Sequence, residues 1–299
     1  MAFTKPSAET HIDEALVRAL LHHQHPDLAS LRLTPVGEGW DNAVFRLGDD
    51  LAVRMPRRAA TAALIEHEQE WLPRLAVRLS LPVPTRVRVG RPGCGFPWPW
   101  SIVRWFPGQT AIVSPPEDLR PVAVALGRFL RTLHQPAPPE APHNPWRSIP
   151  LDARTQRLHE HLDQLHGVVN RERVLALWDR LVVTARSSGP PMWIHGDLHS
   201  GNLLINNGEL SAVLDFGDIA AGDPATDLSV MWMLLPPGVR GDLFKASGRD
   251  RSHPGDEQMW RRARGWALAL GVAYLAHANE EDALADLGKR TIAAALTGD

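Results

Sequence analysis

Two polar motifs carry most of the structural information in this chain: HGDLHSGN at residues 195–202 and LDFG at residues 214–217. They place an acid at Asp197, an amide five residues later at Asn202, and a second acid thirteen residues further on at Asp215. Two apolar runs joined by Asn-Asn-Gly lie between the amide and the second acid, and Asn-Gly in that setting strongly indicates a β-hairpin. Such a hairpin would bring both side chains to one pocket beside Asp197.

These three side chains suit the chemistry of phosphoryl transfer. Mg²⁺ prefers hard oxygen ligands and keeps several waters, so Asp215 and the amide oxygen of Asn202 would suffice as its protein ligands. Asp197 would then accept, or orient, the proton of an acceptor hydroxyl. The catalytic loop of protein kinases has the same order, H-R-D-x-x-x-x-N followed by D-F-G, with Gly196 here in place of the arginine. A purely structural role for the two acids would require several independent features to coincide.

The window from His195 to Asp227 resembles the aminoglycoside phosphotransferase family, a branch of the protein-kinase-like fold that includes macrolide, choline and homoserine kinases. The resemblance implies that Asp197 is the catalytic aspartate and that the amide and second acid of the motifs bind Mg²⁺. It also implies that the segment Gly222-Asp223-Pro224, with Asp227, braces the catalytic loop.

The order of the predicted elements indicates an α+β protein with two lobes, as the kinase-like resemblance implies. Residues 1–105 hold short strand-like runs and helices, which predict a small antiparallel, nucleotide-binding sheet. Residues 106–299 read as mainly helical around the motif region, and we assign them the catalytic loop and the acceptor pocket. We expect a first helix over residues 10–21, capped by Thr10, and a proline-rich connector over residues 136–150.

The bulk composition excludes several kinds of protein. A formal net charge of −2 gives no basic surface for nucleic acid. The longest nearly apolar run, residues 266–278, is too short to span a bilayer, and the N-terminus lacks an apolar signal core. Cys94 is the only cysteine, which excludes an intrachain disulfide and is consistent with a reducing compartment. We therefore expect a cytoplasmic protein without nucleic-acid or membrane partners; its oligomeric state is not indicated.

The family resemblance also implies nucleotide contacts in the first lobe. Gly37, Gly39 and Asn42 lie in a turn where the family places its nucleotide-covering loop, and glycines let backbone amides approach phosphate oxygens. Arg54 stands where the family usually has a phosphate-binding lysine on the third strand. A guanidinium can bind phosphate through two nitrogens, but arginine and lysine are not interchangeable. Glu68 is the expected partner of Arg54.

Arg104 and Trp105 form the expected hinge between the lobes, where backbone groups would bind a purine. Either ATP or GTP fits this expectation as the phosphoryl donor. Two further polar residues allow two interpretations each. Asp218 either lines the acceptor pocket or caps a turn. His199 either contacts the phosphate or substrate, or supports the catalytic loop.

The acceptor is expected to be a small molecule with a hydroxyl group, most simply an aminoglycoside-like antibiotic. A polycationic aminoglycoside calls for carboxylates, and acids are available in the C-terminal part, although such runs are typical of solvated helix faces: Asp256, Glu257, Glu280, Glu281 and Asp282. The apolar stretches 231–235 and 266–274 would suit a macrolide or a core. The alternatives are a kinase of a macrolide or of a small metabolite (a sugar, choline-like compound or amino alcohol), and a non-catalytic pseudokinase, which only Arg54 favours.

Overall fold

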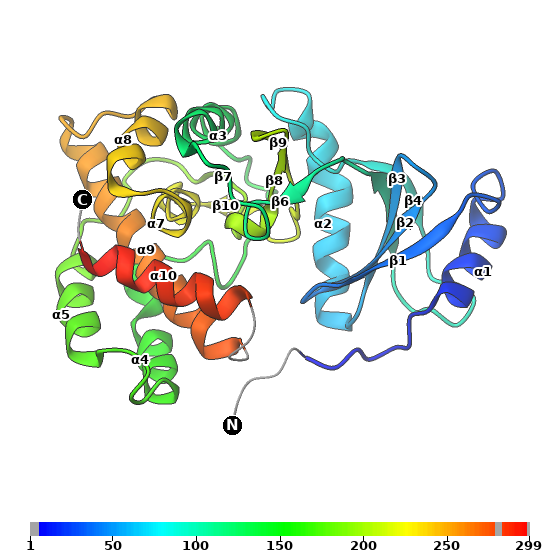
Figure 1. Cartoon of the computed structure of the whole chain (residues 1–299), viewed down its shortest axis with the longest axis horizontal. Coiled ribbons are helices and arrows are strands. Elements are labelled where there is room, and N and C mark those ends of the chain that lie inside the picture. The colour runs from blue at the N-terminus through cyan, green and yellow to red at the C-terminus, as the bar shows by residue number, and fades with distance from the viewer. Residues whose placement is uncertain (1–5, 279–282, 298–299) are drawn as a thin grey trace.

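A five-stranded antiparallel sheet forms the N-terminal lobe, with strand order β1-β2-β3-β5-β4. The fold is seen in a computed structural model that describes residues 6–278 and 283–297, and Figure 1 shows this sheet on one side of the molecule and the helical lobe on the other. The strands are β1 (Leu33–Glu38), β2 (Asn42–Leu47), β3 (Leu51–Pro56), β4 (Arg86–Gly90) and β5 (Trp100–Arg104).

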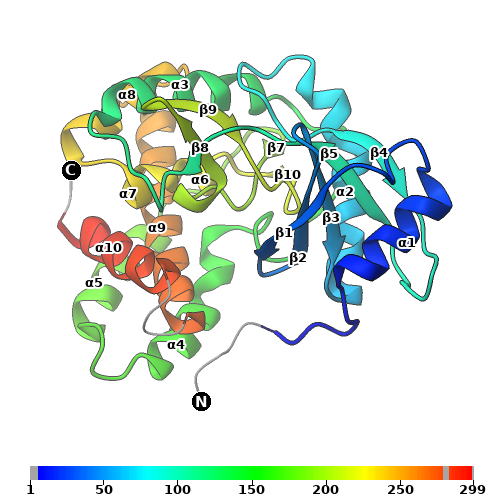
Figure 2. The same cartoon turned by 45° about the vertical axis from the view of Figure 1, so that its right-hand side comes forward.

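Two helices accompany this sheet. The helix α1 (Glu14–Gln24) begins later than predicted, because Asp13, and not Thr10, caps it by accepting a hydrogen bond of 2.8 Å from the Leu16 amide. The helix α2 (Ala59–Ala76) continues past Pro73. It contacts β3 and β5 and lies between the sheet and the helical lobe (Figures 1 and 2).

The C-terminal lobe is mainly helical, as predicted. Its helices are α3 (Leu119–Leu133), the 3-10 helix η1 (Leu151–Arg154), α4 (Thr155–Gln164), α5 (Arg171–Val182), α6 (Ala225–Leu228), α7 (Val230–Leu234), α8 (Pro237–Ala246), α9 (Pro254–His277) and α10 (Ala283–Thr297). The apolar run within α9 is buried, which confirms its reading as a core helix. Of the helices in the described residues, none is both long and apolar enough to cross a membrane.

The helix α9 organises this lobe, with α10 packed along it (Figure 1). Their close approach depends on glycine, since a Cβ on Gly288 would lie 2.7 Å from the carbonyl oxygen of Gly271. Short strands carry the motif region: β7 (Met192–Ile194) pairs with β10 (Ala220–Gly222), and β6 (Gln109–Thr110), β8 (Leu203–Asn206) and β9 (Glu209–Val213) form a second small sheet. The first sheet ends at Arg104, and the division into residues 1–105 and 106–299 stays a prediction.

Candidate active site

The β8–β9 hairpin brings the predicted metal ligands to one end, as the sequence predicted. Leu203 pairs with Val213 at this end of the hairpin. Just beyond that pair, the amide of Leu214, which follows β9, donates a 2.8 Å hydrogen bond to the carbonyl of Asn202, which precedes β8. The hairpin tip has Asn207 and Gly208 in the left-handed region, at φ 52° and 81°, as the Asn-Gly signal requires. Asp215 follows the hairpin at φ 58°, an uncommon conformation for a residue other than glycine.

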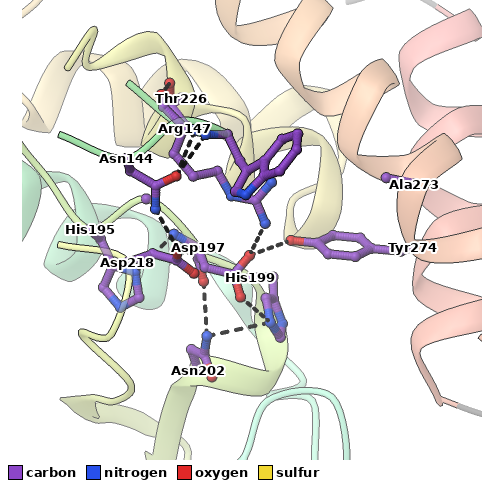
Figure 3. Close-up of polar contacts among 12 residues, drawn as sticks. Asn144, Arg147, His195, Asp197, His199, Asn202, Asp218, Thr226, Ala273 and Tyr274 are labelled. Carbon is purple, nitrogen blue, oxygen red and sulfur yellow. Dashed lines mark hydrogen bonds and ion pairs between the residues drawn. The ribbon is translucent and has the colours of Figure 1, made fainter. Parts of the chain in front are cut away.

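Asp197 lies directly beside this end of the hairpin. The Asn202 side-chain nitrogen donates a 2.8 Å hydrogen bond to the Asp197 carbonyl (Figure 3), and its amide oxygen accepts no hydrogen bond from the described residues. Asp197 and Asp215 line one cleft together with residues of both lobes: Asp41, Asn42, Arg54, Leu64, Ile65, Glu68, Gly217 and Asp218. The structure therefore brings the three motif residues together.

Asp227 holds the loop that carries Asp197. Its fully buried carboxylate accepts hydrogen bonds from the amides of His195 and Gly196, at 2.8 and 2.9 Å, and contacts His134 Nε2 at 3.0 Å. Burial alone would raise the pKa of Asp227, but these hydrogen bonds, led by that of His134, keep the pKa below its ordinary value. The carboxylate is therefore ionised and braces the loop, as the resemblance implied.

The two residues before Asp197 have separate structural roles. His195 contacts the Leu214 carbonyl through Nε2 at 2.8 Å and accepts from the Asp197 amide through Nδ1, so this network requires a neutral ring protonated on Nε2. Gly196 has φ 86°, and a Cβ there would lie 2.5 Å from the Asp218 carbonyl oxygen. This close approach explains why glycine replaces the arginine of the kinase motif.

Arg54 links the two lobes across the cleft. One guanidinium nitrogen donates to Glu68 at 2.5 Å and the other donates to Asp215 at 2.8 Å. Burial alone would lower the pKa of Arg54, but Glu68 and then Asp215 raise it above its ordinary value, so the group stays cationic. The expected partnership with Glu68 is present, and the arginine also reaches a motif acid.

The predicted nucleotide-covering turn lies at the mouth of this cleft, but only part of it faces inward. Asn42 lines the cleft, whereas Gly37 and Gly39 are not among its lining residues. Gly37 adopts φ 152° at an irregularity in the β1–β2 pairing, and the Gly39 amide donates to the Asn42 carbonyl at 2.8 Å. The buried Asn42 side-chain oxygen has no hydrogen-bond partner within the described part of the chain.

The predicted hinge residues lie outside the cleft lining. Arg104 is exposed, and the Trp105 amide donates to the Asp50 carbonyl at 2.7 Å, so that donor is already used. The Trp105 ring packs against the Arg46 guanidinium at 5.3 Å. Nucleotide contacts by Arg104 and Trp105 stay predictions.

Acidic side chains crowd this cleft, and their mutual repulsion bears on metal binding. Burial, followed by Asp215, raises the pKa of Asp41 to about 6. Burial raises the pKa of Asp218 to about 6 as well, with Asp197 adding to the effect against the opposing Arg147. A divalent cation would relieve this repulsion, and the free oxygens of Asn202 and Asp215 are the hard ligands that Mg²⁺ prefers. The residues therefore fit Mg²⁺ held partly by the nucleotide phosphates.

Arg147 and Tyr274, which the sequence reading missed, converge on Asp197. Arg147 donates to Asp197 Oδ1 at 2.9 Å, and the Tyr274 hydroxyl of α9 donates to the same oxygen at 3.0 Å (Figure 3). The other oxygen, Oδ2, lies 3.5 Å from His199 Nε2. Burial would raise the pKa of Asp197, but Arg147 and then His199 hold it well below its ordinary value. Asp197 is therefore an ionised, oriented carboxylate.

Arg147 is positioned by the segment that was read as a connector. The Asn144 side-chain oxygen accepts hydrogen bonds from the amides of Trp146 and Arg147, at 2.8 and 3.0 Å, and its nitrogen donates to Asp218 at 2.5 Å. Asp218 lines the same cleft as Asp197 and Asp215, and its role in an acceptor pocket stays a prediction. In the sequence, the only signal for this arrangement was an Asn and an Arg close together in a proline-rich stretch. Asn often forms turns by hydrogen-bonding to nearby backbone amides, and such a turn orients the side chains that follow it.

The acids considered for an aminoglycoside do not lie beside Asp197 where the structure describes them. Asp256 and Glu257 are in the first turn of α9, and Tyr274 is in its last turns, roughly 25 Å away along the helix axis. Glu257 accepts from Arg251, and Asp256 accepts from the Asp250 amide. Residues 280–282 are outside the described residues.

Comparisons with known proteins agree with this geometry. A family model described as the phosphotransferase enzyme family matches residues 32–266. A comparison with curated proteins finds no match. Among solved structures, the GDP complex of wild-type aminoglycoside 2'-phosphotransferase-IIIa matches with a TM-score of 0.73 and 21% identity, covering 96% of this chain and 100% of that chain.

Two further solved structures have the same fold. The GDP and kanamycin complex of APH(2")-IIia matches with a TM-score of 0.71 and 20% identity, covering 95% of this chain and 99% of that chain. The macrolide 2'-phosphotransferase MphH from Brachybacterium faecium, an apoenzyme, matches with a TM-score of 0.61 and 21% identity, covering 94% and 98%. These likenesses confirm the predicted two-lobed, kinase-like α+β fold. Because the family model spans most of the sequence, this chain belongs to the phosphotransferase enzyme family, in agreement with the resemblance of its motifs to the aminoglycoside phosphotransferases.

Proposed function

We propose that this protein is a kinase that transfers the γ-phosphoryl group of ATP or GTP to a hydroxyl group of a small molecule. The proposal is carried by Asp197 and Asp215, which line one cleft, and by Asn202, which is hydrogen-bonded to Asp197 at the same end of the hairpin. The acceptor oxygen would bond to the γ-phosphorus while the bond to the β–γ bridging oxygen breaks, and the hydroxyl proton would pass to Asp197. Oδ2 suits this role because Arg147 and Tyr274 both donate to Oδ1.

Asn202 and Asp215 would hold Mg²⁺, which would offset the charge of the phosphates when bound. Arg54 would keep Asp215 in place and offer its remaining donors to the nucleotide, while Glu68 fixes the guanidinium. This ion-pair network supports an enzyme over the pseudokinase that the arginine had suggested. Gly37, Gly39 and Asn42 remain the proposed cover of the phosphates, with Arg104 and Trp105 at the proposed purine hinge.

A nucleotide-consumption screen tests this proposal. ATP and GTP are each offered with Mg²⁺ and a panel of aminoglycosides, macrolides, sugars and amino alcohols, since solved relatives of the fold include complexes with kanamycin and gentamicin. We expect acceptor-dependent consumption that falls by about 10³-fold or more in Asp197→Ala, with nucleotide affinity and thermal midpoint little changed. Normal turnover in that variant would remove Asp197 from the mechanism.

A further inference from the structure

Basic side chains gather on the acceptor side of Asp197, within the segment that runs from Arg147 into α4. Arg147 donates to Asp197, and Arg157 of α4 lies over the Trp146 ring at 4.9 Å. Arg157 is also 3.5 Å from Glu160 on its own helix, and both of these side chains are partly exposed. The remaining arginine of this segment, Arg154, has a different environment.

Arg154 is a buried cation without a counter-ion in the described residues. It is 5% exposed, its side chain makes no hydrogen bond or ion pair there, and its Nε is enclosed without a partner. Its guanidinium lies 5.8 Å from the ring centre of Trp266. A buried charge is strongly unfavourable unless an opposite charge or several hydrogen bonds accompany it. Only Nε is enclosed in this way, so the two terminal nitrogens of the guanidinium remain available to an anionic group.

Arg154 belongs to the same neighbourhood as the Asp197 contacts. It ends η1, which packs against α9 so closely that a Cβ on Gly265 would lie 2.5 Å from Leu151. Tyr274 lies further along α9 and donates to Asp197. Burial and, after it, the positive charges of Arg147 and Arg157 lower the pKa of Arg154 to about 10, whereas Tyr274 opposes them. Two of the residues whose charges act on Arg154, Arg147 and Tyr274, are therefore the same residues that donate hydrogen bonds to Asp197.

We propose that the acceptor carries an anionic group, a carboxylate or a phosphate, which pairs with Arg154 while its hydroxyl reaches Asp197. This inference rests on the proposed kinase function and narrows its substrate class. An anion would supply the missing counter-charge, and a guanidinium binds both groups through two nitrogens. A polycationic aminoglycoside would instead meet Arg147, Arg154 and Arg157 with charges of the same sign.

Calorimetric titration of the nucleotide-loaded protein tests the inference. Mg²⁺ and a non-hydrolysable ATP or GTP analogue fill the nucleotide site, and the probes are glucuronate, glucose 6-phosphate, glucose and kanamycin. We expect saturable binding of at least one anionic sugar, at least about tenfold tighter than that of glucose or kanamycin. Glucuronate and glucose 6-phosphate distinguish a carboxylate from a phosphate. Equal or tighter binding of glucose or kanamycin, or no binding of either anion, overturns the inference.

Two variants locate the binding site. Arg154→Met should weaken anion binding at least about tenfold, whereas Arg128→Met, an exposed arginine of α3, should leave it unchanged. If Arg154→Met does not fold, Arg154→Lys decides, because it keeps the charge but loses the two-nitrogen geometry and should bind the anion more weakly. Unchanged anion affinity in whichever of these Arg154 variants folds overturns the assignment.

Nucleotide consumption separates this inference from the proposed function. Suppose that kanamycin or a neutral sugar causes nucleotide consumption that depends on Asp197, and that no anionic sugar does. That result would leave the proposed kinase function intact and would overturn the anionic acceptor. Anion binding that depends on Arg154 without any consumption supports the anion site and overturns the kinase function.

Discussion

The two sides of Asp197 are assembled from different parts of the chain. On the side proposed to bind the nucleotide lie Asn202 and Asp215, which flank one hairpin close to Asp197 in the sequence. On the acceptor side the carboxylate contacts Arg147 and Tyr274, which are 50 and 77 residues away. The nucleotide side is rich in acids, whereas the acceptor side is rich in arginines. In this chain the proposed phosphoryl-transfer residues therefore come from one short motif, whereas the residues on the proposed acceptor side come from distant segments.

Removing Arg54 should cause the largest change on the nucleotide side. Arg54→Met leaves the buried Glu68 without its counter-charge, and breaking a buried ion pair in this way costs about 3–5 kcal/mol. The free energy of unfolding, measured in urea, should fall by that amount, and nucleotide affinity should fall with it. Arg54→Lys is the matched control and should be destabilised much less. An equally stable Arg54→Met protein would show that the buried Arg54–Glu68 ion pair does not stabilise the fold.

Removing Arg147 should have the next largest effect, and it tests the acceptor side. In Arg147→Met, burial is no longer opposed by the guanidinium, so the pKa of Asp197 rises. The acid limb of the kcat/KM profile should therefore move to higher pH, and the lost orientation of Asp197 should lower kcat/KM about tenfold at neutral pH. Arg147→Lys keeps the charge and should keep the limb in place. A loss of activity with an unmoved limb would contradict this role.

Tyr274→Phe removes one hydrogen bond to Asp197 and should lower kcat/KM about fivefold, the equivalent of about 1 kcal/mol. Thermal stability should change little, because the ring is retained. Tyr274→Phe combined with Arg147→Met should give a non-additive loss, since both residues contact Oδ1. Strict additivity would show that the two contacts act independently.

Magnesium should stabilise the protein in a pH-dependent way. Asp41 and Asp218 have pKa values raised to about 6 from an ordinary 3.8, so the folded state binds more protons than the unfolded state between those values. Stability from these groups is therefore lost as the pH rises through that window. Added Mg²⁺ should raise the thermal midpoint by a few degrees at pH 7.5 and much less at pH 5. An equal shift at both pH values would contradict this account.

The sequence predicted the parts of the site that depend on short-range geometry. The hairpin and the loop before it could be read from Asn207-Gly208 and the spacing of Asp197, because turn preference and strand pairing act over a few residues. The partnership of Arg54 with Glu68 was also anticipated, from the family resemblance. Arg147 and Tyr274 could not be found this way, because their contacts with Asp197 depend on the turn at Asn144 and on where α9 lies in the folded protein.

Two local predictions show the same limit. Asp13 and Thr10 both have side chains that can cap a helix, so the sequence alone does not choose between them. In the structure, Asp13 is the cap. The segment 136–150 looked like a connector because its prolines dominate its composition. This segment also positions Arg147, because the hydrogen bonds of Asn144 turn the chain and orient Arg147 toward Asp197.

The hydroxyl of Tyr274 belongs to the only tyrosine in the sequence. Biosynthetic labelling with 3-fluorotyrosine would therefore introduce a single ¹⁹F nucleus of known origin, in a ring whose oxygen lies 3.0 Å from the Asp197 carboxylate. One resonance would then report the arrival of an acceptor or a change in the charge of that carboxylate, with no assignment experiment and with every other side chain unchanged.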